Sequence, residues 1–299
     1  MAITDNRALR SFVRNANRLV ATPFNSRDAA TRAAGRLGTG SASALRRAVG
    51  GRVVLVTGAS TGIGRAAAVS LAAAGAKVLV VARSEDLLIE LVEEITESGG
   101  LAVAYRCDLT DLEAIDDLAA KVLDQHGHVD VLVNNAGMSI RRKVRHSVGR
   151  FQDFERPMQL NYFAAVRLTM GLLPTMVERE SGQVVNISSW AAIMHPARFS
   201  GYAASKAALE AWSDSVQGEV LGDGVVFTDI HMPLVRTPMI APTKLYSQLP
   251  ALSMDQAAQV ICDAVVSRSR KVTPLAAGMT TLVDSVSRRL GDRIRQAAI

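Results

Sequence analysis

The stretch Val53-Val54-Leu55-Val56-Thr57-Gly58-Ala59-Ser60-Thr61-Gly62-Ile63-Gly64 decides the fold of this chain. It joins an apolar run of strand length to a glycine-rich turn, and a helical pattern then covers residues 63–74. Glycines allow a backbone to approach a pyrophosphate, and a helix N-terminus supplies free N–H groups with a favourable dipole. The stretch therefore predicts a dinucleotide site. The expected cofactor contacts here are Gly58, Ser60, Thr61, Gly62, Ile63 and Gly64.

The same strand-then-helix pattern continues along the chain. Apolar runs of strand length occupy residues 53–56, 78–81, 102–105, 129–133, 184–187 and 225–230. Helical patterns occupy residues 63–74, 85–98, 111–126, 155–178 and 203–221, and a further helix and a last strand are expected within 255–275. Valine-rich runs without polar alternation indicate a parallel sheet that is covered on both faces. The predicted fold is α/β, a doubly wound parallel sheet of the Rossmann type with helices on both faces.

The positive charge of the chain is concentrated in residues 1–50. This segment has nine arginines and only two acidic residues, a net charge of +7, whereas the whole chain carries +6. The remaining residues therefore carry −1, and a nucleic-acid partner is not expected because the basic residues do not cluster on the folded part. The predicted organisation is an N-terminal extension and linker at 1–50, then one domain at 51–299 with a substrate loop near 232–252.

The extension has apolar residues at helical spacing between Leu9 and Val20, with arginines around them, and Gly35 to Ser43 is expected to be a linker. Three roles stay open. The helix docks on the domain or on a sister subunit, it lies on an anionic membrane surface, or it belongs to a mitochondrial presequence. The expected location is cytoplasmic, with membrane association or mitochondrial targeting depending on these residues.

Several classes of protein are disfavoured by composition. The two cysteines, Cys107 and Cys262, provide no disulfide framework, and no metal site is expected. No apolar run is long enough for a spanning helix. The five histidines are scattered and are expected on the surface or in loops.

The second strand ends in Val81-Ala82-Arg83-Ser84, which bears on the choice of cofactor. NAD-specific sites usually place a carboxylate where Ala82 stands, and Arg83 suits a 2′-phosphate. We therefore expect NADP(H) rather than NAD(H), with the alternative that Arg83 simply faces solvent. Asp108, at the end of the third strand, is expected to bind the adenine amino group or to act as a turn residue.

A tyrosine and a lysine four residues apart form the chemical centre. Tyr202 and Lys206 lie on one face of a predicted helix, one turn apart. A phenol is a weak acid at neutral pH, and a neighbouring ammonium favours the phenolate, which makes proton exchange easier. Ser189 lies 13 residues before Tyr202 and is expected to hold the substrate oxygen. The spacing favours it over Ser188.

Residues 51–275 resemble the short-chain dehydrogenase/reductase family, with its motifs in the family's order. Asn134-Asn135-Ala136-Gly137 is similar to the family's N-N-A-G, which steadies the sheet and borders the nicotinamide ribose, and Asn135, Ala136 and Gly137 are the cofactor contacts that it implies. Asn161 stands where the family has an asparagine that bulges a helix and holds a proton-relay water, although alone it could be an ordinary helix residue. The resemblance implies the catalytic set Asn161, Ser189, Tyr202 and Lys206, of which Tyr202 and Lys206 also contact the cofactor.

One motif departs from the family. Where the family usually has P-G-x-V-x-T, this chain has Met232-Pro233-Leu234-Val235-Arg236-Thr237, so Leu234 replaces a glycine and the backbone is less free. Pro233, Val235 and Thr237 are still expected to contact the cofactor. The family's association through long helices implies a homodimer or homotetramer.

Two segments resemble the reductase domain of bacterial fatty acyl-CoA reductases. They are Ser139–His146, which is rich in basic residues, and Met232–Tyr246. The basic stretch suits the phosphates of CoA or an acidic acyl carrier protein, unless it is only a solvated loop. The apolar residues in and just after the second segment suit a tunnel for a chain, unless they pack on the core or on another subunit. These are Met232, Leu234, Met239, Ile240, Leu245 and Leu249.

The main hypothesis is an NADPH-dependent reductase of a long-chain acyl-CoA, a fatty aldehyde or a 3-oxo lipid. The alternatives are a dehydrogenase that oxidises a steroid, sugar alcohol or small secondary alcohol, and a dinucleotide-binding protein without catalysis. The intact set of four residues argues against the last.

Overall fold

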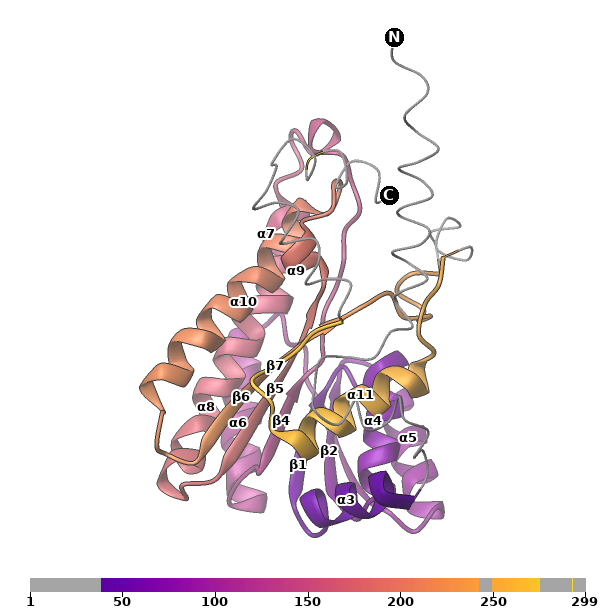
Figure 1. Cartoon of the computed structure of the whole chain (residues 1–299), viewed down its shortest axis with the longest axis vertical. Helices are drawn as coiled ribbons and strands as arrows, with labels where there is room; N and C mark the ends of the chain where they lie inside the picture. The colour runs from indigo at the N-terminus through magenta and orange to yellow at the C-terminus, as the bar shows by residue number, and fades with distance from the viewer. Residues whose placement is uncertain (1–38, 242–248, 275–291, 293–299) are drawn as a thin grey trace.

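The computed structural model describes residues 39–241, 249–274 and 292, and within them seven parallel strands form one sheet. The strand order is β3-β2-β1-β4-β5-β6-β7, so the winding direction reverses between β1 and β4 (Figure 1). Such a reversal opens a crevice at the carboxyl ends of the central strands, where ligands bind in sheets of this kind. The strands are β1 (Val53–Thr57), β2 (Lys77–Ala82), β3 (Leu101–Arg106), β4 (Val131–Asn134), β5 (Gly182–Ser189), β6 (Val225–Met232) and β7 (Lys271–Val272).

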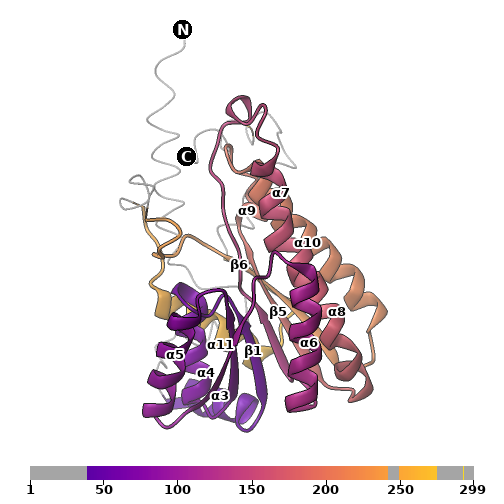
Figure 2. The ribbon, with the colours of Figure 1, turned by 180° about the vertical axis from the view of Figure 1, so that it is seen from behind.

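Helices cover both faces of the sheet, as Figures 1 and 2 show from opposite sides. One layer contains α3 (Thr39–Val49), α4 (Gly62–Ala73), α5 (Glu85–Glu97) and α11 (Met254–Ser267). The other contains α6 (Leu112–His126), α8 (Ala164–Glu178) and α10 (Ser200–Glu219). The predicted doubly wound fold is therefore confirmed.

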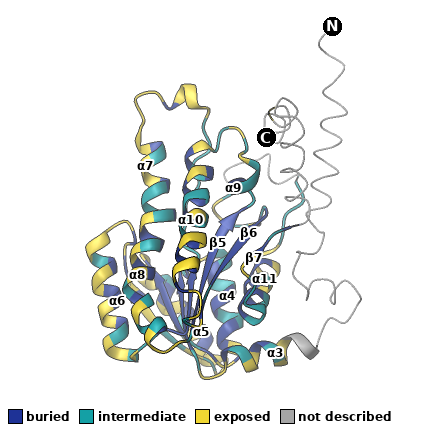
Figure 3. Cartoon of the chain, turned by 60° about the vertical axis from the view of Figure 1, so that its left-hand side comes forward, coloured by how far each residue is buried: buried dark blue, intermediate teal, exposed yellow. Residues whose placement is uncertain are grey.

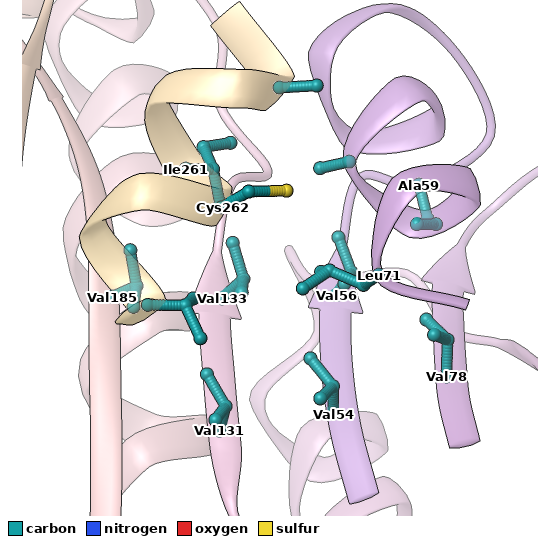
Figure 4. Close-up of a cluster of buried hydrophobic side chains, with 14 of the residues drawn as sticks. Val54, Val56, Ala59, Leu71, Val78, Val131, Val133, Val185, Ile261 and Cys262 are labelled. Atoms are coloured by element: carbon teal, nitrogen blue, oxygen red, sulfur yellow. The ribbon is translucent and has the colours of Figure 1, made fainter. Parts of the chain in front are cut away.

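The core consists of two apolar clusters, one on each side of the sheet. Figure 4 shows Val56 of β1 and Val133 of β4 pointing toward Leu71 of α4 and Ile261 of α11. Every residue of β1, β4 and β5 is buried, which explains why these strands show no polar alternation (Figure 3).

The helix expected over 155–178 is in fact three segments: α7 (Gln152–Met158), the π-helical turn η3 (Gln159–Phe163) and α8. Two further short segments carried too little periodicity to be predicted, the 3₁₀ turn η2 (Val144–His146) and α9 (Ala191–Met194). The wider turn of η3 inserts one residue into the helix without ending it.

The expected linker over Gly35 to Ser43 is wrong in its second half, because α3 begins at Thr39. Leu45 and Val49 of this helix are buried and pack in the same cluster as α11. Burial of these apolar side chains stabilises α3, although its first residues have a low intrinsic preference for helix. The folded domain therefore begins before residue 51. The amphipathic segment 9–20, Leu245, and the tail from residue 275 lie outside the described residues, apart from residue 292.

The expectation that the histidines are surface or loop residues is wrong for His231. It lies on β6, is 1% exposed, and is held at 2.8 Å by both Glu210 and Thr273. Polar partners on α10 and after β7 make this burial possible. Across the described residues, no helix is long and apolar enough to cross a membrane, and no cluster of three potential metal ligands occurs.

Candidate active site

A cavity of about 480 Å³ lies at the carboxyl ends of the strands, where the winding direction reverses. Every cofactor contact predicted from the sequence lines it except Gly64, and of the expected catalytic residues Ser189, Tyr202 and Lys206 do so. Gly64 and Asn161 are buried behind its wall. Besides Tyr202 and Lys206, fourteen further predicted residues from distant parts of the chain line this one cavity. They are Gly58, Ser60, Thr61, Gly62, Ile63, Arg83, Asp108, Asn135, Ala136, Gly137, Ser189, Pro233, Val235 and Thr237.

The turn between β1 and α4 requires its glycines. Gly58 has φ +64°, and a Cβ there would lie 2.9 Å from the Cα of Ala136. Gly62 has φ +63°, a conformation that side chains rarely adopt. A Cβ on Gly64 would lie closer than 3.0 Å to both the Asn135 amide nitrogen and the Gly58 carbonyl oxygen. The turn is therefore packed directly against the end of β4.

Asn135 ties this turn to β4. Its side-chain amide donates to the carbonyl oxygens of Thr57 at 2.9 Å and Gly58 at 3.2 Å. The Thr57 hydroxyl oxygen accepts the backbone N–H groups of Asn135 and Ala136, each at 3.0 Å. These four bonds fix the two backbone segments that face the cavity.

The preceding residue, Asn134, acts inside the sheet. Its amide donates to the Thr169 hydroxyl at 3.1 Å and to the Asn186 side-chain oxygen at 3.0 Å. Asn186 in turn donates to Asp229 at 3.1 Å, and burial raises the pKa of that carboxyl to about 7. A polar chain thus crosses from β4 through β5 to β6 below the cavity.

Tyr202 and Lys206 project from the first turns of α10 into the cavity, beside the end of β5. The Lys206 ammonium donates to the carbonyl oxygen of Ile187 at 2.6 Å, and burial lowers the pKa of Lys206 to about 8. Ser189 ends β5, and its hydroxyl oxygen accepts the Ala191 N–H at 3.1 Å. The Ser189 hydroxyl proton is therefore available to a ligand oxygen in the cavity.

Ser188 also lines the cavity, and its buried hydroxyl has no hydrogen-bond partner among the described residues. The geometry therefore brings both serines to the wall, and the spacing argument alone separates them.

Asn161 lies in the π-helical turn η3, so the helix bulge implied by the family resemblance is confirmed. Its side-chain oxygen accepts the Met138 N–H at 2.8 Å, and its amide donates to the Met138 carbonyl and to the Ser205 hydroxyl, each at 2.9 Å. Ser205 donates in turn to the Tyr202 carbonyl oxygen at 2.8 Å. Asn161 therefore joins the segment after β4 to the helix that carries Tyr202.

At the far end of the cavity, Arg83 and Asp108 lie near each other. Asp108 accepts the backbone N–H of Thr110 at 3.0 Å and its hydroxyl at 2.8 Å. The backbone bond, aided by the positive charge of Arg83, lowers the pKa of Asp108. Arg83 itself is exposed and also lines the cavity.

The other end of the cavity is apolar. Of the residues expected to form a tunnel, Met232, Leu234, Met239, Ile240 and Leu249 line it. Sequence reasoning missed the residues of the segment between Ser189 and Tyr202 that complete this end. They are Trp190, Met194, Pro196 and Phe199. Their place between two expected site residues was the one signal that could have identified them.

Part of the basic stretch after β4 makes contacts with other segments of the protein. The Arg142 guanidinium pairs with buried Asp153 at 2.8 Å, and the Arg142 N–H donates to the Arg198 carbonyl oxygen at 2.8 Å. This stretch is therefore more than a solvated loop, because it is fastened to α7 and to the segment before α10.

Comparison with known proteins agrees with this architecture. Residues 52–246 match the family model for short chain dehydrogenases. A fatty acyl-CoA reductase of Acinetobacter baylyi is 52% identical over 228 residues, which are 76% of this chain and 77% of that protein. A fatty acyl-CoA reductase of Mycobacterium tuberculosis is 43% identical and covers 82% of this chain and 84% of its own length. A metagenomic short-chain oxidoreductase solved in complex with NADP aligns with a TM-score of 0.65 at 29% identity, over 76% of this chain and 96% of the other.

Proposed function

Because the chain belongs to the short-chain dehydrogenase/reductase family, we propose that it is an NADPH-dependent reductase of a lipid-type carbonyl: a fatty acyl-CoA, a fatty aldehyde or a 3-oxo lipid. The observation that carries the proposal is that Tyr202, Lys206 and Ser189 line the same cavity as the glycine-rich turn and a set of apolar side chains. The similarity to two fatty acyl-CoA reductases supports the lipid class.

The polar end fits a nicotinamide dinucleotide. Gly58 and Gly64 bring bare backbone to the start of α4, and Thr61, the residue before that helix, makes no side-chain bond to its free N–H groups. Such a helix start suits a pyrophosphate. Arg83 suits a 2′-phosphate and Asp108 an adenine amino group, whereas Asn135, Gly137, Pro233, Val235 and Thr237 would hold the nicotinamide half. When bound, this cofactor supplies the hydride.

The side chains of Ser189, Tyr202 and Lys206 would handle the oxygen of the substrate. The Ser189 hydroxyl donates to the carbonyl oxygen and orients it, and the Tyr202 hydroxyl gives it a proton. The Lys206 ammonium stabilises the phenolate that remains on Tyr202. Asn161 binds Met138 directly and the backbone of Tyr202 through Ser205, so it fixes the positions of these two residues relative to each other. An apolar wall from Trp190 and Phe199 to Met239 excludes water from an aliphatic chain.

The decisive experiment follows NADPH oxidation with acyl-CoAs, aldehydes and 3-oxo lipids of increasing chain length. Tyr202→Phe removes only the hydroxyl, so turnover is expected to fall by at least about 100-fold while NADPH binding persists. Retained turnover in Tyr202→Phe, or oxidation of secondary alcohols with no reduction of any of these carbonyls, would contradict the proposal.

Two neighbouring serines provide a matched pair. Ser189→Ala is expected to lower kcat by about 10-fold or more, whereas Ser188→Ala, which removes a hydroxyl without a described partner, is expected to leave kcat near the wild-type value. The reverse result would assign the substrate oxygen to Ser188.

The choice of cofactor has its own test. Arg83→Ala is expected to weaken NADPH by about 10-fold or more and NADH little, because only the former carries the 2′-phosphate. An equal loss of affinity for NADPH and NADH would show that Arg83 does not bind the 2′-phosphate. The homodimer or homotetramer implied by the family stays a prediction.

A further inference from the structure

Residues 140–151 form a projecting lobe between β4 and α7, and we name it the β4–α7 lobe. It is the exposed segment beyond α7 at the top of the molecule in Figure 3. Three large apolar side chains of this lobe face solvent: Val144 is 68% exposed, Val148 84% and Phe151 70%. These three exposed side chains lie within eight residues of chain, and we call them the apolar tip of the lobe.

The charge of the lobe has one sign. Residues 140–151 contain Arg141, Arg142, Lys143, Arg145 and Arg150 and no acidic residue. Buried Asp153 engages two of these, Arg142 at 2.8 Å and Arg150 at 3.5 Å. Among the described residues, Arg141, Lys143 and Arg145 have no carboxylate partner. The apolar tip is therefore surrounded by uncompensated positive charge.

The lobe is fastened to neighbouring segments of the domain. Asp153 holds it from inside, since the carboxylate also accepts the Ser147 hydroxyl at 3.3 Å. The Arg142 N–H donates to the carbonyl oxygen of Arg198. Pro196 and Phe199, on either side of Arg198, line the apolar end of the cavity. The lobe is therefore tied by this bond to a segment that lines the cavity.

We propose that the β4–α7 lobe docks the protein on an anionic lipid bilayer. The side chains of Val144, Val148 and Phe151 enter the interface, and Lys143 and Arg145 lie at the level of the lipid phosphates. Apolar side chains that enter the headgroup region, together with basic residues that attract anionic lipids, are the combination that binds an interface of this kind. The inference goes beyond the proposed function, because docking does not depend on which carbonyl is reduced.

A probe at the tip tests this directly in the full chain. Cys107 and Cys262 are 6% and 1% exposed, so a cysteine introduced by Val148→Cys can be labelled selectively with an environment-sensitive fluorophore. Leu221→Cys is the matched control, since Leu221 is 79% exposed in the turn after α10. Vesicles of phosphatidylcholine with phosphatidylglycerol are expected to shift the emission to the blue at position 148 and not at position 221. Membrane binding through another part of the chain leaves the probe at 148 in water.

The contradicting outcomes are distinct. No shift at position 148, an equal shift with neutral phosphatidylcholine vesicles, or an equal shift at position 221 overturns the proposal. A shift that needs no vesicles and grows with protein concentration assigns the lobe to a second copy of this chain. A shift only with an acidic acyl carrier protein assigns it to a protein partner. Each of the last two outcomes also overturns membrane docking.

The charge can be tested separately. Lys143→Gln and Arg145→Gln are each expected to lower the affinity for anionic vesicles about fivefold. Lys121→Gln, an exposed lysine on α6, is expected to leave it unchanged. Equal thermal midpoints of the three variants confirm that folding is intact, and unchanged affinity in both lobe variants overturns the electrostatic part. Because the experiment measures vesicle binding rather than turnover, its result tests membrane docking independently of the proposed reaction.

Discussion

Gly64→Ala tests the construction of the cofactor turn most directly. Gly64 lies in the first turn of α4, and the added methyl group would lie closer than 3.0 Å to the Asn135 amide nitrogen and to the Gly58 carbonyl oxygen. The first contact can be relieved only if Asn135 gives up its bonds to Thr57 and Gly58. The second involves backbone, which cannot rotate away. The turn or the start of the helix must therefore move.

The magnitude follows from opposing effects. Alanine is favoured over glycine inside a helix by up to about 1 kcal/mol. Overpacking costs about 1–3 kcal/mol, and each lost hydrogen bond costs about 0.5–1.5 kcal/mol. The overpacking and the two Asn135 bonds outweigh the helix preference, so we expect a net destabilisation of about 2–3 kcal/mol. Displacement of the turn is expected to weaken NADPH binding by at least about tenfold, which corresponds to 1.4 kcal/mol.

The assay compares urea unfolding and calorimetric NADPH titration with those of Gly218→Ala. Gly218 is also a helical glycine, in the last turns of α10, and a Cβ there would meet nothing within 4 Å. This control is expected to match or exceed the wild-type stability by up to about 1 kcal/mol, with unchanged NADPH affinity. If Gly64→Ala unfolds at the wild-type urea concentration and binds NADPH equally well, the reasoning about the packed turn is refuted.

Two further outcomes are expected. Burial lowers the pKa of Lys206 to about 8, so the free protein loses the Lys206 proton above that pH and the ammonium can no longer bind the cofactor. The Kd for NADPH should therefore rise about fivefold between pH 8 and 9 in titrations with the wild type, and stay flat in Lys206→Met; a flat wild-type profile would speak against the assignment. Asn161→Ala removes three hydrogen bonds of a side chain that is 1% exposed, and should destabilise the protein by about 2–4 kcal/mol in urea unfolding and lower kcat by about tenfold or more. An Asn161→Ala variant with the wild-type urea midpoint would show that Asn161 does not join Met138 to α10.

Much of the fold was accessible from local patterns. Buried parallel strands such as β1 and β2 consist mostly of consecutive apolar residues, and helices such as α4 and α11 carry an apolar side at helical spacing. These patterns are properties of short stretches of chain, so they can be identified without knowing what packs against them. The glycine turn and the Tyr202–Lys206 spacing are local in the same sense, and the structure places both at one cavity.

Other features depend on contacts between distant segments and had no local signature. The burial of His231 requires Glu210 and Thr273, which lie 21 and 42 residues away. The start of α3 depends on a surface of α11 that follows it by about 200 residues. The segment between Ser189 and Tyr202 lines the cavity only because β5 and α10 are adjacent in space.

The sequence by itself predicted the parallel sheet, the glycine-rich turn and the Tyr202–Lys206 pair, since each of these depends on the spacing of neighbouring residues. Only the tertiary structure decided which of them touch the cavity. Gly64 and Asn161 are buried next to the residues that line the cavity and do not line it themselves. Arg142 of the basic stretch forms an ion pair with Asp153. The physical reason is that periodicity fixes the direction of a side chain relative to its own helix or strand, whereas its partner is fixed by how the whole chain closes on itself.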